Sequence, residues 1–136
     1  MDRGDMDYQL YGFLIGKDVH FEIGSGQLYR LSSNGTEKHL IFGALFFSDT
    51  MLQLFLYMLK HGRDNRVTKE ELLKKIWEDN KLSPSPQRLW QVLTGLNKKL
   101  QTLGLPDEFI KTIKGSGYTI GFKEIIPLYY RSSEIL

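Results

Sequence analysis

The sequence predicts an α+β domain in which short antiparallel strands precede three helices and a closing β-hairpin. Turn residues divide the chain between residues 11 and 42 into short apolar segments, which is typical of strands. Apolar residues then recur at helical spacing in three successive segments. Two short strand-like runs around a glycine-containing turn follow at residues 109–122.

Composition narrows the class of protein. A chain of 136 residues with 41% hydrophobic and 25% charged residues is expected to form one globular domain. The absence of cysteine excludes disulfides and thiolate metal sites. His20, His39 and His61 lie in separate segments without ligand spacing, so no metal site and no cofactor are expected.

Neither a leader nor a membrane span is predicted within the chain. Residues 1–7 are acidic and polar, unlike a signal peptide. The longest apolar run, residues 40–47, is too short to cross a bilayer. We therefore expect these 136 residues to be soluble.

Charge is distributed unevenly along the chain. Residues 1–80 carry ten Lys and Arg against twelve Asp and Glu, whereas residues 81–123 carry seven against two. A basic excess on one segment is what a phosphate backbone attracts, although a solvated face with chance asymmetry would look the same.

Four short strands form the first part of the predicted domain: Phe13–Ile15, Val19–Ile23, Gln27–Leu31 and Lys38–Phe42. Ser33-Asn34-Gly35 is a strong hairpin signal, because Asn-Gly accepts the positive φ angles of a type I′ turn. The strands should form an antiparallel meander that covers a helical layer with one face. We expect residues 1–10 to be a flexible lead, 11–123 the domain and 124–136 a tail or linker.

Two helices follow the strands. The first begins at the capping residue Ser48 and ends at Gly62, which can adopt the left-handed conformation. The second begins with a capping box, in which Thr68 binds the amide of Glu71 and Glu71 reaches back, and runs to about Trp77. The apolar stripe of the first helix is Met51, Leu52, Phe55, Met58 and Leu59.

A third helix is predicted over residues 87–103, after a proline-containing loop and capped by Ser83 or Ser85. Its apolar side is Leu89, Val92, Leu93, Leu96, Leu100 and Leu103. The side chains available for DNA contact are Gln87, Arg88, Gln91, Thr94, Asn97 and Lys98. Amides that donate and accept together suit base edges, although an ordinary solvated helix shows similar residues.

The hairpin places two strands, Phe109–Ile113 and Tyr118–Phe122, around the tip 114–117. Its two glycines let the backbone approach a partner closely, and Lys111 and Lys114 supply positive charge. A helix with a polar face beside a basic hairpin suits DNA recognition.

Three motifs carry a family resemblance: Thr68-x-x-Glu-Leu-Leu with Ile76-Trp77, Leu96-Asn-Lys-Lys-Leu100, and Ile110-Lys-Thr-Ile-Lys-Gly-Ser-Gly-Tyr118. With them, the stretch 11–122 resembles the winged helix-turn-helix domain of OmpR/PhoB-type transcriptional regulators. The resemblance implies sequence-specific binding of double-stranded DNA, with the third helix in the major groove and the hairpin wing in the minor groove. The residues expected at the wing and DNA backbone are Thr68, Lys111, Thr112, Lys114, Ser116 and Tyr118.

The resemblance also implies partners. Paired or tandem copies would bind repeated half-sites, and the loop 79–86 would meet RNA polymerase. Because no receiver-like segment precedes the domain, the chain is most similar to the ToxR/CadC-like branch, in which a transmembrane helix follows. We expect a cytoplasmic chain that meets the membrane only through a segment absent from it, or a stand-alone regulator.

One departure from the family concerns the third helix. Where the family has Arg-Leu-Arg, this chain has Gly95-Leu96-Asn97, and Gly95 costs about 1 kcal/mol of helix stability relative to Ala. Base contact could pass to Gln91, Thr94 and Lys98. The alternative is a winged-helix protein-interaction module with weakened DNA binding that acts through a partner or dimerisation. An enzyme is not expected, because no carboxylate pair or histidine cluster suits catalysis.

Overall fold

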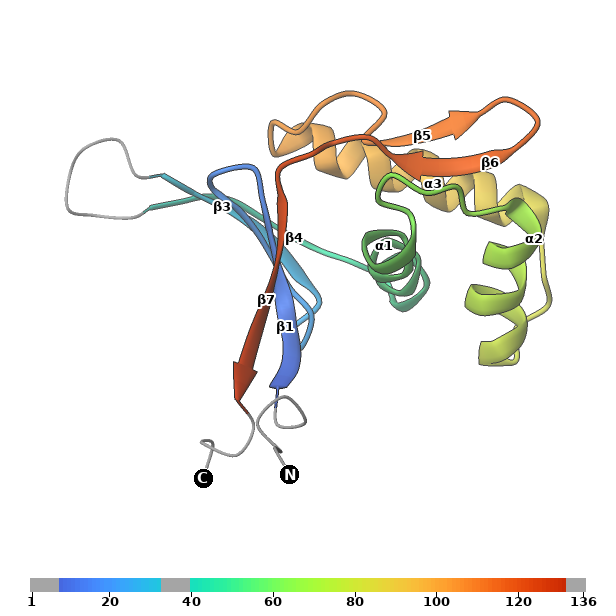
Figure 1. Ribbon diagram of the computed structural model, residues 1–136, viewed down its shortest axis with the longest axis horizontal. Coiled ribbons are helices and arrows are strands. Elements are labelled where there is room, and N and C mark those ends of the chain that lie inside the picture. Colours follow the sequence, from blue (N-terminus) through green and yellow to red (C-terminus); the bar gives the residue numbers. More distant parts are fainter. Residues whose placement is uncertain (1–7, 33–39, 132–136) are drawn as a thin grey trace. The chain divides into compact units, whose positions relative to one another are not determined.

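The computed structural model describes residues 8–32 and 40–131, which form two compact units (Figure 1). One unit holds the described residues up to Phe46 together with those from Glu124 onward, and the other is Phe47–Lys123. The expected turn at Ser33-Asn34-Gly35 lies outside the described residues. No helix within the described ranges is long and apolar enough to cross a membrane.

The first unit is a five-stranded antiparallel sheet with the order β4-β3-β2-β1-β7. Its strands are β1 (Tyr8–Ile15), β2 (Val19–Glu22), β3 (Gln27–Ser32), β4 (Leu40–Phe46) and β7 (Ile125–Arg131). The four-stranded meander is thus confirmed, and β4 extends beyond the predicted end at Phe42.

The fifth strand corrects two expectations about the ends of the chain. Residues 8–10 belong to β1 rather than to a flexible lead, and 125–131 form β7 rather than a tail. The two strands pair from Tyr8 opposite Arg131 to Ile15 opposite Ile125. Pro127 is tolerated there because β7 is an edge strand, where a missing backbone N–H breaks no ladder.

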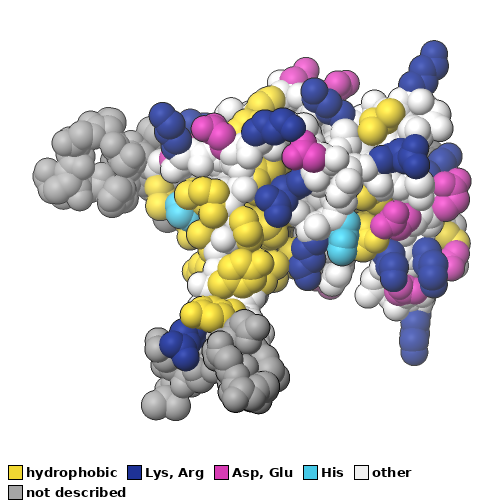
Figure 2. Space-filling model, viewed as in Figure 1, with side chains coloured by type: hydrophobic (Ala, Val, Ile, Leu, Met, Phe, Trp, Pro, Cys, Tyr) yellow, Lys and Arg dark blue, Asp and Glu magenta, His cyan; other side chains and the backbone are white. Residues whose placement is uncertain are grey.

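Strand alternation gives the sheet one buried face. Phe13 lies opposite Phe21, Phe21 lies opposite Leu28, and all three side chains are buried. Gly12 permits the close approach of β1 and β2, because a Cβ there would lie 2.0 Å from the carbonyl oxygen of Phe21. Hydrophobic side chains also gather on the visible surface over β1 and β7 (Figure 2). In the described part of this unit, the exposed large hydrophobic residues are Tyr8, Tyr11, Ile126, Tyr129 and Tyr130.

The second unit contains the helices and the hairpin. The helices are α1 (Asp49–His61), α2 (Lys69–Leu72) and α3 (Pro86–Thr102). The chain continues from α2 through a π-helical turn (Leu73–Trp77) and a 3-10 turn (Glu78–Asn80). The hairpin consists of β5 (Ile110–Ile113) and β6 (Gly117–Ile120), both shorter than predicted.

The cap of α1 is as predicted, but its end differs. The Ser48 hydroxyl accepts a hydrogen bond from the Met51 amide at 3.4 Å. The helix ends at Gly62, whose φ of −107° is not left-handed. A Cβ there would lie 2.5 Å from Cε and 3.0 Å from the carbonyl oxygen of Met58, so a larger residue would require the Met58 side chain to move. The buried stripe is Leu54, Phe55, Met58 and Leu59, while Met51 and Leu52 are half-buried.

The capping box of α2 is half confirmed. Thr68 Oγ1 accepts a hydrogen bond from the Glu71 amide at 3.0 Å. The Glu71 carboxylate accepts a hydrogen bond from the Tyr57 hydroxyl of α1 rather than reaching back to Thr68. This second bond ties α2 to α1.

The third helix follows the prediction closely. The Ser85 hydroxyl accepts a hydrogen bond from the Arg88 amide at 3.2 Å, which identifies the cap between the two candidate serines. Pro86 occupies the first turn, where its missing N–H costs nothing. All six residues of the predicted apolar side are buried: Leu89, Val92, Leu93, Leu96, Leu100 and Leu103.

The hairpin is attached to the second unit along β6. Val67 and Tyr118 exchange two backbone hydrogen bonds of 2.8 Å each, and the Ile120 amide donates to the Gly62 carbonyl at 2.8 Å. The connection between α1 and α2 therefore runs beside β6 and forms isolated β-bridges with it.

Candidate nucleic-acid interface

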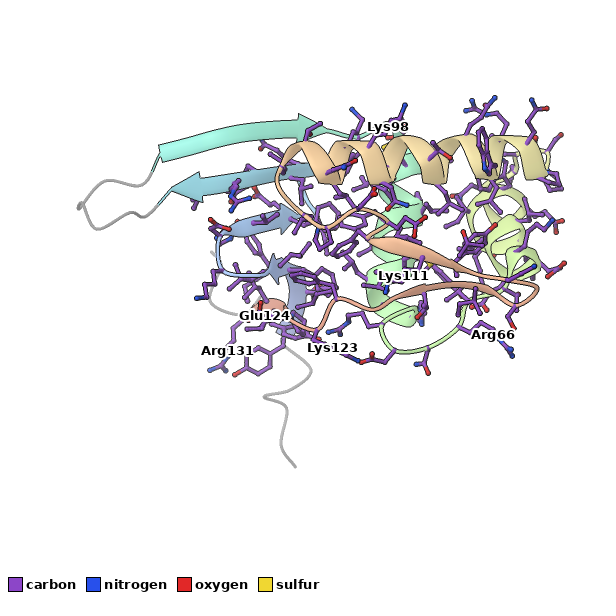
Figure 3. The ribbon with its side chains drawn as sticks, turned by 90° about the horizontal axis from the view of Figure 1, so that it is seen from above. Arg66, Lys98, Lys111, Lys123, Glu124 and Arg131 are labelled. Carbon is purple, nitrogen blue, oxygen red and sulfur yellow. The ribbon has the colours of Figure 1, made fainter. Side chains whose placement is uncertain are left out.

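The polar face of α3 is present as predicted. Gln87, Arg88, Gln91 and Lys98 are exposed and Thr94 is half-buried. Figure 3 labels Lys98 on this helix and Lys111 on the neighbouring strand β5. Two amides and two cations on one exposed helix face can donate and accept hydrogen bonds at base edges and phosphates.

Asn97 lies at the edge of this face, where it lines the groove toward the wing, and its side chain is bound to the backbone of β5. Its Nδ2 donates to the Ile110 carbonyl oxygen at 3.0 Å, and its Oδ1 accepts from the Ile110 amide at 3.0 Å. The side chain is half-buried, and its amide is occupied by the chain's own backbone. Asn97 therefore fastens α3 to β5.

The wing offers a mixture of cations and hydroxyls. Lys111, Thr112 and Lys114 are exposed, and Ser116 and Tyr118 are half-buried. Ser116 Oγ accepts a hydrogen bond from Arg66 Nη1 at 3.1 Å, so that Arg66 adds a further cation at the tip (Figure 3). The sequence did not single out Arg66, because it precedes α2 and lies 50 residues from Ser116.

The two wing glycines serve different purposes. Gly115 has a φ of +72° and nothing within 4 Å of an added Cβ, so its backbone is open to a partner. Gly117 has a φ of +124°, and a Cβ there would lie 2.3 Å from the Val67 carbonyl oxygen. The expected close approach to a partner therefore fits Gly115, whereas Gly117 approaches its own chain.

Two hollows join α3, the wing and the start of α2 into one surface. A groove of about 480 Å³ separates α3 from the wing, and a second hollow of about 550 Å³ lies between the wing tip and α2. Thr112 and Tyr118 line both. We call this the α3–wing surface, whose side chains include Arg66, Thr68, Lys69, Trp90, Thr94, Lys98, Thr112, Ser116 and Tyr118.

Hydroxyl groups on this surface are available as donors. Burial raises the pKa of Tyr118, and the nearby Glu70 carboxylate raises it further, so the hydroxyl keeps its proton at neutral pH. Thr68 uses an oxygen lone pair for its cap and retains its own O–H. Protonated hydroxyls beside cations suit the oxygens of an anion such as phosphate.

Trp90 is a further member of the surface that sequence reasoning left aside. It lines the groove between α3 and the wing and is 65% exposed. A single apolar residue at the shoulder of a polar helix face gives no periodic signal, so only its exposure in the fold reveals it. Within the described ranges, no group of three His, Asp or Glu side chains is placed to hold a metal ion.

The fold and this surface define an OmpR/PhoB-type winged-helix DNA-binding domain of transcriptional regulators. The family model described as "Transcriptional regulatory protein, C terminal" matches residues 45–120, and the chain belongs to this family. The predicted fold class and the family resemblance are thereby confirmed. No curated protein sequence matches the chain.

Solved structures agree with this fold. The DNA-binding domain of E. coli CadC is 18% identical, with a TM-score of 0.65 over 88% of this chain and 98% of that one. The DNA-binding domain of the response regulator AdeR, solved in complex with an intercistronic region, is 18% identical, with a TM-score of 0.57 over 78% and 96%. The C-terminal domain of the nisin resistance regulator NsrR is 28% identical, with a TM-score of 0.51 over 82% and 94%.

Proposed function

We propose that this chain is a sequence-specific regulator of transcription that binds double-stranded DNA with α3 in the major groove and the wing in the adjacent minor groove. The observation that carries the proposal is the pair of hydrogen bonds between Asn97 and Ile110. They hold a polar helix face and a basic hairpin at a fixed spacing, as recognition of two neighbouring grooves requires.

The exposed residues of α3 divide into two kinds. Gln87, Gln91 and Thr94 are the proposed base contacts, since amides pair well with adenine and hydroxyls bind several bases. Arg88 and Lys98 supply contacts to guanine or phosphate. Without Asn97, direct readout rests on fewer side chains than the sequence predicts.

The wing and the start of α2 are proposed to grip the DNA backbone. Lys111, Lys114 and Arg66 provide charge for phosphates. Hydroxyl donors to phosphate oxygens come from Thr68, Thr112, Ser116 and Tyr118. These contacts would set the position on the duplex and add affinity without reading sequence.

Selection from a pool of random duplexes, followed by footprinting, tests the proposal. Purified protein is expected to enrich one short motif and to protect it at moderate salt, with heparin as a competitor of nonspecific binding. Equal affinity for all duplexes, together with a flat response to salt, would contradict it.

A second candidate is a module that acts mainly through a protein partner. Leu82 is 46% exposed in the loop 79–86, and such an exposed apolar side chain suits a protein contact. The family resemblance suggests RNA polymerase as the partner at this loop. Pull-down of purified polymerase by wild-type protein but not by Leu82→Asp supports this role, and operator protection by the chain alone excludes a purely partner-dependent module.

We also propose that copies of the chain bind repeated half-sites in pairs, in the cytoplasm of a bacterium. The support is the family resemblance, including the branch in which such a domain is anchored by a membrane helix. Footprints that span two equally spaced motifs support paired binding, whereas protection of one isolated motif contradicts it.

A further inference from the structure

Trp90 is an exception among the apolar residues of α3. The helix buries its other apolar side chains, while Trp90 leaves 65% of its surface in water. The chain's second tryptophan, Trp77, is 4% exposed and belongs to the core. Covering a large, water-exposed indole with a partner buries much apolar surface, which contributes favourably to the free energy of binding.

The position of Trp90 places it beside the proposed base contacts. At 100° per residue, it lies about 60° from Gln87 and about 40° from Thr94 around the helix axis. Trp90, Thr94 and Lys98 follow at steps of four and line the same groove toward the wing. Trp90 thus flanks the polar face on its wing side.

The chemistry of the major groove contains one apolar group that suits an indole. Each base edge there presents hydrogen-bond donors and acceptors, and only thymine adds a C5-methyl group. The terminal amides of Gln87 and Gln91 suit the polar groups of the base edges rather than this methyl group. An exposed aromatic plane beside them can pack on it.

We propose that Trp90 is a specificity-determining residue that packs against a thymine C5-methyl group in the major groove. The inference rests on the proposed function, and it adds an apolar readout to the polar one. It also supplies a base contact in a helix where Asn97 is committed to Ile110.

Deoxyuridine substitution in the selected duplex tests this inference, because it removes the methyl group and leaves the pairing edge unchanged. Each thymine is replaced in turn, and affinities are measured for wild type and Trp90→Ala. Wild type is expected to lose about fourfold at one thymine, the effect of one buried methyl. Trp90→Ala is expected to bind the thymine and deoxyuridine duplexes equally.

Two controls isolate the contact. Gln91→Ala, on the same exposed face, is expected to keep the wild-type response to deoxyuridine. Thermal unfolding of Trp90→Ala is expected to match wild type, because the indole is mostly exposed. Fluorescence of Trp90 in a Trp77→Phe background is expected to change when the thymine duplex binds.

The outcomes separate this inference from the proposed function. If a duplex is enriched but no deoxyuridine substitution changes the affinity of wild type for it, the proposed role of Trp90 is overturned and the proposed function stands. If Trp90→Ala weakens binding to the thymine and deoxyuridine duplexes by the same factor relative to wild type, Trp90 contacts the sugar-phosphate backbone. That result also overturns the thymine contact. Failure to enrich any duplex overturns the proposed function, and the thymine contact falls with it.

Discussion

Asn97 holds both backbone groups of Ile110: its Nδ2 donates to the carbonyl oxygen and its Oδ1 accepts from the amide, each at 3.0 Å. Ile110 pairs with Ile120 in the hairpin. The Asn97 side chain, carried by α3, therefore makes the two hydrogen bonds to Ile110 that the backbone of a neighbouring strand would make. Through it, the orientation of the wing is linked to the helix that is proposed to read DNA.

Removal of this amide is expected to destabilise the second unit. Asn97→Ala leaves the amide and carbonyl of Ile110, which is 3% exposed, without that partner, at a cost of about 1–3 kcal/mol. Chemical denaturation measures the loss, and hydrogen exchange at the Ile110 amide should accelerate. Gln101→Ala, at an exposed position of α3, is the matched control and should be neutral. Unchanged stability and protection in Asn97→Ala would show that the wing is held by other contacts.

The two wing glycines form a matched pair for substitution by alanine. Gly115→Ala should cost about 1 kcal/mol, since its φ of +72° is unfavourable for a side chain but the space is open. Gly117→Ala should cost more than about 2 kcal/mol, because the methyl group also meets the Val67 carbonyl oxygen. Unfolding free energies of both variants check the order. Equal losses would mean that β6 can move away from Val67.

Gly95→Ala is expected to stabilise the protein by about 0.5–1 kcal/mol, because alanine restricts the unfolded chain and favours the helix. The new methyl group would lie 3.4 Å from Cε of Met51, the end of a flexible side chain that can adjust. Thermal and chemical unfolding measure the effect. A destabilised variant would show that the contact with Met51 is too tight.

Salt dependence tests the proposed backbone contacts. Lys98→Ala and Lys114→Ala should each reduce the slope of log affinity against log salt by about 1, because each removes one phosphate contact. Lys60→Ala removes an exposed cation from the last turn of α1, outside the α3–wing surface, and should leave the slope unchanged. A similar reduction in all three variants would indicate an effect of net charge alone.

Alkaline pH should weaken the link between α1 and α2. Burial, reinforced by the hydrogen bond to the Glu71 carboxylate, raises the pKa of Tyr57 from 10.0 to about 12. Because the folded state favours the protonated phenol, this stabilisation is complete below pH 10 and is lost as the pH rises through about 12. Thermal unfolding across this range should show a steeper decline in wild type than in Tyr57→Phe. Parallel curves would assign the decline to other groups.

Local patterns were sufficient to predict the helices and the hairpin. The buried side of α3 follows from residue spacing alone, and Ser48 and Thr68 mark their helix starts by residue type. Pairing between distant segments was not predictable in this way. Strand β7 joins β1 across most of the chain, and Pro127 obscures its strand pattern.

In the candidate site, too, the features set by local sequence were predictable and those set by contacts between distant segments were not. Residue type and helical spacing identified the exposed Gln87, Gln91 and Lys98. The commitment of Asn97 to Ile110 depends on how α3 lies against β5, which spacing along one helix cannot reveal. Arg66 likewise enters the surface only through the return of β6 past the connection between α1 and α2.

The pairing of β1 with β7 has a mechanical consequence. Tyr8 and Arg131 are opposite each other at one end of this antiparallel pair. A force applied to these two residues would load the hydrogen bonds one after another, as in opening a zipper, rather than all at once in shear. The residues from Phe47 to Lys123 lie outside that force path, so the sheet would peel at low tension before the helices and the wing bear any load.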